Sequence, residues 1–303
     1  GLVIICPLYA AGEKRNTKFN LIKFANLISK NSKTQVIIVN NEIDLKKFFT
    51  AMICLNENQD PLNILRKVEN KLGKEVEAFE YMPAFYVKEF YRLFPKKVKL
   101  FDRYHDINIL LEVASNSDVM NDEDNSGTSI LKNHLEEILS SFLDENLLED
   151  VLIAQNDTQR KSMWEIREAA AEITVSRKPV VITDVSLPLD SVSNFINLVN
   201  MKLDHVEKQA PSTFVSHLGD GNVHYWVWPK YDDKLLHDNI VEIIEGIVYD
   251  LKGSFSAEHG IGIAKLNSMK RRKDNTAVDV MLAIKNALDP TNIMNPGKVF
   301  PKG

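Results

Sequence analysis

Cysteine is scarce in this sequence, because the 303 residues contain only Cys6 and Cys54. The two lack the spacing of a metal site, so a reducing compartment fits best. Positive charge is not in excess either, since 37 Lys and Arg against 42 Asp and Glu give a net charge of −5. This balance argues against a general nucleic-acid binder, and the one dense basic run, Lys270–Lys273, is typical of a solvated helix end.

Long hydrophobic runs are also missing. The N-terminal segment GLVIICPLYA is apolar, but it is short, contains Pro7 and has no basic region before it. It therefore matches neither a signal peptide nor a membrane span. The sequence starts with Gly1 instead of Met, as if a strand were entered partway through. We expect the chain to be part of a longer protein.

A nucleotide-binding glycine loop is not evident. The glycine-rich turn His259–Gly262 lacks the G-x-G-x-x-G order and the strand-to-helix setting with a later acidic residue. Its glycines more plausibly let the backbone pass close to a bound group.

The composition is that of an ordinary globular protein, with 44% hydrophobic and 26% charged residues. Within it, one pattern of secondary-structure elements occurs twice. Apolar strand-like segments and amphipathic helical segments follow one another in the order β-α-β-β-α-β. The first unit is expected to have strands at 49–55, 75–82, 106–115 and 149–155, helices at 60–73 and 128–145, and an aromatic helical stretch at 84–94. The second unit is expected to have strands at 180–188, 212–218, 223–229 and 253–258, and helices at 190–206, with Asp190 as N-cap, and 233–252.

This duplication predicts an α+β fold in which two ferredoxin-like β-α-β-β-α-β halves form a mostly antiparallel sheet with helices on one face. A helix at about 157–176 would connect the halves, and the polar residues 116–127 would form a loop. Residues 49–303 would then make up one domain.

The stretch HLGDGNVHYWVW, residues 217–228, places His217 and His224 an odd number of positions apart. In one regular strand such residues point to opposite faces of the sheet. The intervening Gly219–Asn222 has the composition of a hairpin turn, because glycine supplies positive φ and Asp-Gly is a strong hairpin signal. A turn here would bring the two imidazoles together.

His217, His224 and Glu258 then form a candidate metal set of two histidines and one carboxylate. These ligands suit Zn²⁺, Mn²⁺ or Fe²⁺, and three protein ligands leave a position open for a substrate oxygen. From spacing alone, the alternative that each histidine is an ordinary core or surface residue is about equally favoured.

Arg167, in MWEIREAAAEI, is a second candidate because arginine binds carboxylates with two parallel hydrogen bonds. A surface arginine that covers apolar packing is the stronger alternative for this position. Trp226 and Trp228 share one strand face and are expected in the core or in a pocket wall.

These stretches together resemble the C-terminal part of the FAD-linked D-2-hydroxyacid dehydrogenases, the D-lactate, D-2-hydroxyglutarate and glycolate dehydrogenase type with a vanillyl-alcohol-oxidase-type flavin fold. The segments SHLGDGNVH, GSFSAEHGIGIAK and IKNALDPTNIMNPGKVF match the signatures of that family in order and spacing, and AFEYMP, WEIREA and TDVSLP resemble its weaker ones. The resemblance covers about residues 49–303. It implies that residues 1–48 hold the end of a preceding FAD-binding domain and a connection.

The resemblance implies an activity and a role for each candidate residue. A D-2-hydroxyacid would be oxidised to the 2-oxoacid with hydride transfer to FAD, and the FAD would be bound mainly by an N-terminal domain outside these residues. His217, His224 and Glu258 would hold a divalent metal, Zn, Mn or Fe. His259 would be the catalytic base, and Arg167 would bind the substrate carboxylate. Asn222, Asn295 and Lys298 lie in signatures near the cofactor and are assigned to cofactor binding.

Two positions depart from relatives that bind dicarboxylates. Those relatives have a second cationic residue where this chain has Ile182, and a small polar residue where Trp226 stands. An apolar pair fits poorly with a distal carboxylate, because a buried unpaired charge is costly. The resemblance therefore favours D-lactate or another monocarboxylic 2-hydroxyacid.

The same resemblance implies an electron acceptor such as a quinone, a cytochrome or an electron-transfer flavoprotein, and no nucleic acid. We expect a cytoplasmic protein, with a membrane-peripheral location and a homodimer left open. Two rival functions remain: a non-catalytic module that binds metal and substrate, and, further behind, a metallohydrolase that activates water with the same ligands.

Overall fold

The computed structural model describes residues 2–5, 35–38, 47–115 and 129–300. The chain divides into two units, residues 1–49 with 113–137 and residues 50–112 with 138–303. In the first unit, β1 (Leu2–Ile5) pairs in parallel with β2 (Gln35–Ile38). Cys6, the rest of the N-terminal segment and the loop expected at 116–127 lie outside the described residues.

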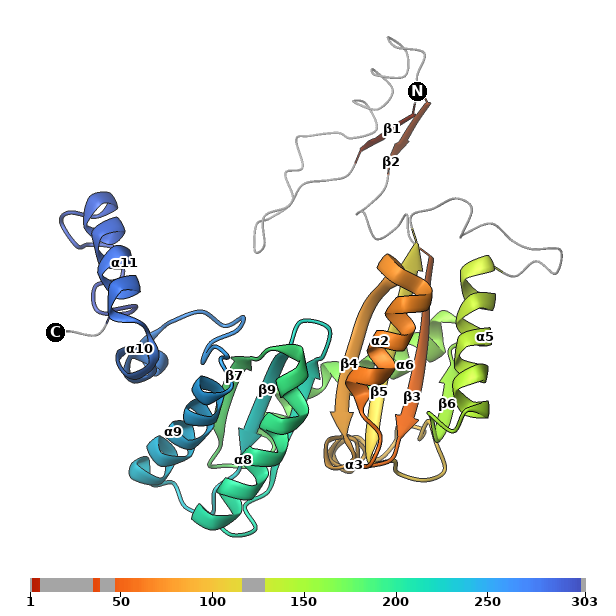
Figure 1. The fold of residues 1–303 in the computed structure, drawn as a ribbon, viewed down its shortest axis with the longest axis horizontal. Helices are drawn as coiled ribbons and strands as arrows, with labels where there is room; N and C mark the ends of the chain where they lie inside the picture. Colours follow the sequence, from red (N-terminus) through yellow and green to blue (C-terminus); the bar gives the residue numbers. More distant parts are fainter. Residues whose placement is uncertain (1, 6–34, 39–46, 116–128, 301–303) are drawn as a thin grey trace. The chain divides into compact units, whose positions relative to one another are not determined.

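The second large feature is a seven-stranded sheet in the order β6-β3-β5-β4-β8-β9-β7 (Figure 1). The pairings β3–β6, β4–β8, β8–β9 and β7–β9 are antiparallel. The strands are β3 (Lys47–Leu55), β4 (Val76–Pro83), β5 (Ile107–Ser115), β6 (Asp150–Ile153), β7 (Val181–Ser186), β8 (Ser212–His217) and β9 (Asn222–Val227).

The order of the strands contains the ferredoxin-like unit twice. In the first half, β6, β3, β5 and β4 are the fourth, first, third and second strands of their unit. In the second half, β8, β9 and β7 are the second, third and first strands. The two halves are therefore joined side by side through their second strands, β4 and β8. The expected α+β class with two related halves is confirmed.

The strand expected at 253–258 is wrong in extent. Only Ser254 pairs with the sheet, as an isolated bridge to Ser186. The backbone then leaves the ladder because its N–H groups bond to Asp184 instead. Ala257 donates to the Asp184 carbonyl, and the next two N–H groups donate to its carboxylate.

Helices cover both faces of the sheet, so the expectation of helices on one face is wrong. Two neighbouring residues of β9 show this. Tyr225 contacts Phe195 of α8 (Val192–Val206), whereas Trp226 contacts Tyr86 of α3 (Ala84–Leu93). Successive strand residues point to opposite faces, so α8 and α3 lie on opposite sides. The helices of the two ferredoxin-like units are α2 (Pro61–Leu72), α5 (Ile130–Asp144), α8 and α9 (Lys234–Asp250); α2 and α8 lie on the near side of the sheet in Figure 1.

The connecting helix is two helices, α6 (Asp157–Glu168) and α7 (Ala170–Val175), which meet at Ala169. Their buried residues join the apolar cluster on the α3 side, which contains Met52, Met82, Tyr86, Leu110, Met163, Ile166, Ile173, Trp226 and Trp228. This packing holds α6 over the same face of the sheet that carries the candidate site.

Side-chain caps define several helix starts. Asp60 accepts from Leu62 N–H at α2, and Asn156 accepts from Gln159 N–H at α6. Asp190 does not cap α8, because Leu189–Ser191 forms a short 3₁₀ turn before the helix and Asp190 pairs with Arg66 instead.

The C-terminal elements are α10 (Leu266–Arg272) and α11 (Asn275–Leu288). Among the described helices, none combines the length and the apolar character that crossing a membrane requires.

Candidate active site

The β8–β9 hairpin brings His217 and His224 to one face of the sheet. His217 is opposite Asn222, and His224 lies two positions further along β9 on the same face. The two imidazole ring centroids are 5.4 Å apart. The turn requires glycine at Gly221, where φ is 74° and a Cβ would lie 2.1 Å from the Leu187 carbonyl oxygen. The convergence expected from the turn composition is therefore present.

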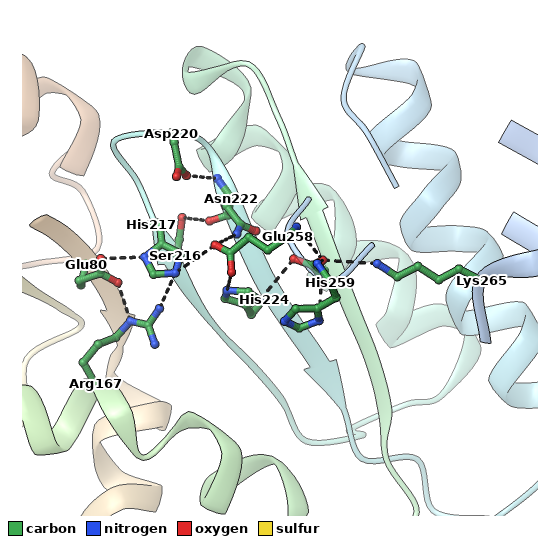
Figure 2. A network of polar contacts seen from close by, with 11 residues as sticks. Glu80, Arg167, Ser216, His217, Asp220, Asn222, His224, Glu258, His259 and Lys265 are labelled. Atoms are coloured by element: carbon green, nitrogen blue, oxygen red, sulfur yellow. Dashed lines mark hydrogen bonds and ion pairs between the residues drawn. The ribbon is translucent and has the colours of Figure 1, made fainter. Parts of the chain in front are cut away.

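Glu258 completes a set of three potential metal ligands (Figure 2). Its Oε1 lies 3.4 Å from His217 Nε2, and its Oε2 lies 3.9 Å from His224 Nε2. The three ligand atoms, one from each residue, all lie within 4.8 Å of one another. Both imidazoles thus present Nε2 to the same carboxylate.

The opposite side of each imidazole is held by a buried carboxylate. His217 Nδ1 is 2.8 Å from Glu80 Oε1, and His224 Nδ1 is 3.5 Å from Asp184 Oδ1. Strand register explains both contacts, since Glu80 is the β4 partner of His217 and Asp184 is the β7 partner of His224. A carboxylate on Nδ1 favours the tautomer in which Nε2 carries the free lone pair, as metal-binding histidines require.

The two histidines differ in pKa. The hydrogen bond with Glu80 raises the pKa of His217, against an opposing effect of burial. Burial lowers the pKa of His224 despite the nearby Asp184 and Glu258 carboxylates. His224 is therefore biased toward the neutral form that binds a metal.

Glu80 and Asp184 remain charged although they are buried. Burial acts to raise the pKa of Glu80, but the hydrogen bond from His217 and the charge of Arg167 outweigh it, so the pKa is lowered. Burial likewise opposes the ionised form of Asp184, but the His259 N–H and the Lys265 ammonium lower its pKa. Lys265 Nζ lies 3.4 Å from Asp184 Oδ2.

Asp184, His224 and His259 form a second possible ligand set, which overlaps the first at His224. In this set the Asp184 carboxylate is almost fully buried and already faces Lys265 and two backbone N–H groups. Glu258, by contrast, has a half-exposed side chain. The set of His217, His224 and Glu258 therefore fits an ion that enters from solvent.

Two polar atoms beside the histidines are buried without a hydrogen-bond partner: Asp184 Oδ1 and Asn222 Oδ1. Such atoms are costly unless a ligand, ion or water satisfies them. Together with the imidazole and carboxylate donors, they show that this side-chain set fits a divalent cation.

Arg167 is buried and belongs to this site, so the alternative of a surface arginine is excluded. Its Nε donates to Glu80 Oε2 at 2.5 Å, and its Nη2 lies 3.1 Å from His217 Nε2 (Figure 2). Arg167 lies in the last turn of α6.

His259 follows Glu258 and lies beside the cluster with a half-exposed side chain. Its ring stacks on His224 with centroids 5.3 Å apart, and its Nδ1 lies 3.7 Å from Asp184 Oδ2. This orientation leaves Nε2 as the nitrogen that can exchange a proton with a ligand.

The remaining expected residues fall in three places. Ile182 and Trp226 are register partners on β7 and β9; Ile182 is 52% exposed and Trp226 is 1% exposed. Asn222 belongs to the histidine cluster, because its side-chain N–H donates to Glu258 Oε1. Asn295 and Lys298 form a turn after α11 and are not part of that cluster. The assignment of these three residues to cofactor binding stays a prediction.

Sequence reasoning did not select Glu80, Asp184 or Lys265 as site residues. The signal for the first two was a charged residue inside an apolar strand, in AFEYMP and VVITDVSLP. Such a charge is buried only if it is paired, so it marks a polar site on that strand face.

Comparison with known proteins identifies the family. The family model described as "FAD linked oxidases, C-terminal domain" matches residues 50–299. The chain belongs to this family. It is 30% identical over 257 residues to a probable D-2-hydroxyglutarate dehydrogenase of Oryza sativa subsp. indica, covering 83% of this chain and 43% of that protein. It is 26% identical over 181 residues to a D-lactate dehydrogenase [cytochrome] of Arabidopsis thaliana, covering 58% of this chain and 32% of that protein.

Solved structures agree on the fold of this FAD-linked oxidase domain. The chain is similar to p-cresol methylhydroxylase, with a TM-score of 0.56 and 10% identity over 83% of this chain and 52% of that one. For 4-ethylphenol oxidase from Gulosibacter chungangensis the TM-score is 0.52, with 13% identity over 84% of this chain and 54% of that one. The chain spans less than half the length of the two curated dehydrogenases it matches.

Proposed function

We propose that this chain is the substrate- and metal-binding part of an FAD-dependent D-2-hydroxyacid dehydrogenase, which oxidises its substrate to the 2-oxoacid. The observation that carries the proposal is the convergence of His217 Nε2, His224 Nε2 and the Glu258 carboxylate, with Arg167 and His259 on either side. A 2-hydroxyacid needs one group for its carboxylate and one for its hydroxyl, and this arrangement supplies both. The names of the relatives support the same reaction.

The protein groups bind the substrate and move one proton. Arg167 holds the carboxylate through its outer guanidinium nitrogen, while its Nε stays on Glu80. His259 takes the proton of the 2-hydroxyl at Nε2, and Asp184 near its Nδ1 stabilises the imidazolium that results. His217, His224 and Glu258 would hold a divalent cation, which when bound polarises the hydroxyl oxygen.

FAD supplies the redox chemistry of the family. The side chains of Arg167 and His259 would bind, orient and deprotonate the substrate. An external electron acceptor follows from the dehydrogenase names of the relatives, and the cytochrome in one of those names is one candidate. The names place those plant proteins in mitochondria, and a cytoplasmic location of this chain stays a prediction. A homodimer stays a prediction.

We propose a monocarboxylic D-2-hydroxyacid such as D-lactate as the substrate. Ile182 and Trp226 lie opposite each other on the site face and offer a distal carboxylate no charge. D-2-hydroxyglutarate is the second candidate, since several similar relatives carry that substrate in their names.

Metal analysis of purified single-site variants tests the site. We expect about one zinc, manganese or iron per wild-type chain, and loss of that metal in His217→Ala and in His224→Ala, because each removes one of three ligands. His259→Ala is the matched control and should retain the metal. Retention in His217→Ala with loss in His259→Ala would assign the ion to Asp184, His224 and His259 instead.

Activity measurements distinguish the proposed function from its two rivals. With a flavin-bearing part supplied, the metal-loaded chain should oxidise D-2-hydroxyacids, and His259→Ala should reduce turnover by about 10²–10⁴-fold as a general base does. Metal binding without any turnover would favour a binding module, and hydrolysis without flavin would favour a metallohydrolase.

A further inference from the structure

We propose that Glu80 is a positioning residue that couples metal binding at His217 to carboxylate binding at Arg167, so that each strengthens the other. This inference rests on the proposed function of the site. It goes beyond that function because it assigns the energetic coupling between the metal and the substrate carboxylate to Glu80, which contacts neither of these ligands.

The position of Glu80 is the first support. Its two carboxylate oxygens are divided between two partners, with Oε1 2.8 Å from His217 Nδ1 and Oε2 2.5 Å from Arg167 Nε (Figure 2). The three residues come from three elements: β4 of the first half, β8 of the second half and α6 between them. Glu80 is 5% exposed, so water does not replace either contact. A movement of either partner therefore shifts the carboxylate and changes its contact with the other partner.

The Nε2 atom of His217 supplies the mechanism of coupling. Because Glu80 holds Nδ1–H, Nε2 has a single lone pair, and Arg167 Nη2 lies 3.1 Å from it as a donor. A cation and an N–H group cannot use the same lone pair. Cation binding at Nε2 therefore releases Arg167 Nη2, while Nε remains on Glu80 and keeps the guanidinium in place for a carboxylate.

Asp184 provides an internal comparison. It lies on the Nδ1 side of His224 at 3.5 Å, within ion-pair range but without the hydrogen bond that joins Glu80 to His217. Its other oxygen accepts from the backbone N–H groups of Glu258 and His259 and from Lys265, and Arg167 is not among its partners. Asp184 should therefore affect metal affinity without linking the metal to Arg167.

The test measures the affinity of the chain for Zn²⁺ by calorimetric titration with and without saturating propionate. Propionate has the carboxylate of the substrate but lacks the 2-hydroxyl. For the wild type we expect propionate to tighten Zn²⁺ binding at least 5-fold, the lower end of typical coupling between sites. Glu80→Gln should weaken Zn²⁺ binding about 10–100-fold and reduce the propionate effect to less than 2-fold, because it replaces one of the two acceptor oxygens with an NH2 donor, so the side chain can no longer present an acceptor oxygen to each partner.

Asp184→Asn is the matched control. It should weaken Zn²⁺ binding by a similar factor but keep the propionate effect at wild-type size. If Glu80→Gln does not fold, Arg167→Lys takes its place, because it leaves the Glu80–His217 contact intact; it should keep Zn²⁺ affinity within about 3-fold and abolish the propionate effect.

The outcomes separate this inference from the proposed function. A wild-type chain that binds no Zn²⁺ would overturn the proposed metal site itself. Zn²⁺ binding that propionate does not affect, or a propionate effect that survives in Glu80→Gln and Arg167→Lys, would leave that site intact and overturn the coupling role. An equal loss of coupling in Asp184→Asn would also overturn it, because the effect would then be a general consequence of disturbing a buried carboxylate.

Discussion

At the scale of single residues, the site depends on one backbone position that only glycine tolerates. Gly221 has a φ of 74° and packs so closely against the Leu187 carbonyl that an added Cβ would clash with the carbonyl oxygen. Gly219, in the same turn, has no positive φ, and a methyl group added there would meet no atom within 4 Å. Two glycines separated by one residue therefore have different requirements, and only one of them aligns the histidines.

We expect Gly221→Ala to lower the free energy of unfolding by about 2 kcal/mol or more, because it adds a steric clash to a strained φ. It should also weaken metal binding, since the turn sets the His217–His224 alignment. Gly219→Ala is the control and should change stability by about 0.5 kcal/mol or less. Urea unfolding measures both, and equal effects in the two variants would contradict this role of Gly221.

At the scale of elements, an ion cluster around one buried carboxylate fixes the chain that leads into β7. Glu89 of α3 is 4% exposed and binds Arg92, also of α3, and Arg177, which precedes β7. Arg177 also lies over the rings of Phe85 and Trp228. Because β7 carries Asp184, this cluster fixes the strand that holds His224 in place.

Glu89→Gln should therefore lower the free energy of unfolding by about 2 kcal/mol at neutral pH. Burial acts to raise the pKa of Glu89, but the hydrogen bonds from Arg92 and Arg177 outweigh it and lower the pKa below its usual 4.5. The contribution is thus complete above pH 4.5 and is lost as the pH falls through the lower pKa of the folded state. The difference between wild type and variant should shrink in that acid range.

The control for this measurement is Glu165→Gln. Glu165 pairs with Lys97 at 2.6 Å, but both side chains are nearly half exposed. Solvent screens such a pair, so the change should be about 0.5 kcal/mol or less at every pH. A Glu89→Gln effect that is equally small, or that does not depend on pH, would contradict the role of the buried cluster.

At the scale of the whole molecule, the chain contains the C-terminal domain of a family whose redox chemistry depends on FAD. The family model covers residues 50–299, which is nearly all of the described seven-stranded sheet and the elements after it. Substrate choice is to be measured with a flavin-bearing part supplied. We propose that it depends on the β7–β9 pair, in which Ile182 lies opposite Trp226.

We expect Ile182→Lys to raise the ratio of kcat/KM for D-2-hydroxyglutarate over D-lactate about tenfold or more, since a cation would pair with the distal carboxylate. Ile182 is half exposed, so the lysine can be accommodated without burying its charge. Ile182→Gln, which is polar but uncharged, is the control and should change the ratio much less. An unchanged ratio in Ile182→Lys would remove the reason for preferring a monocarboxylate.

Much of the fold could be predicted from residue patterns, because strand and helix periodicities are local. The hairpin around Gly221 follows from turn chemistry, and the helix at 60–73 follows from Asp60 and Pro61 at its start. The failures came where a contact between distant residues replaced the local preference. Asp190 binds Arg66 instead of capping α8, and the last expected strand bonds to the Asp184 side chain instead of its neighbour.

The sequence by itself determined the duplicated α+β pattern, the convergence of His217 and His224, and the residue types able to hold a cation with Glu258. Periodicity and turn chemistry act between residues that are close in the chain, so they can be inferred without a structure. Only the tertiary structure decided that Glu80 faces both His217 and Arg167, and that Asp184 faces both His224 and His259. Those contacts depend on the β4–β8 and β7–β9 registers and on α6 packing over them, and no local preference sets which distant strands pair.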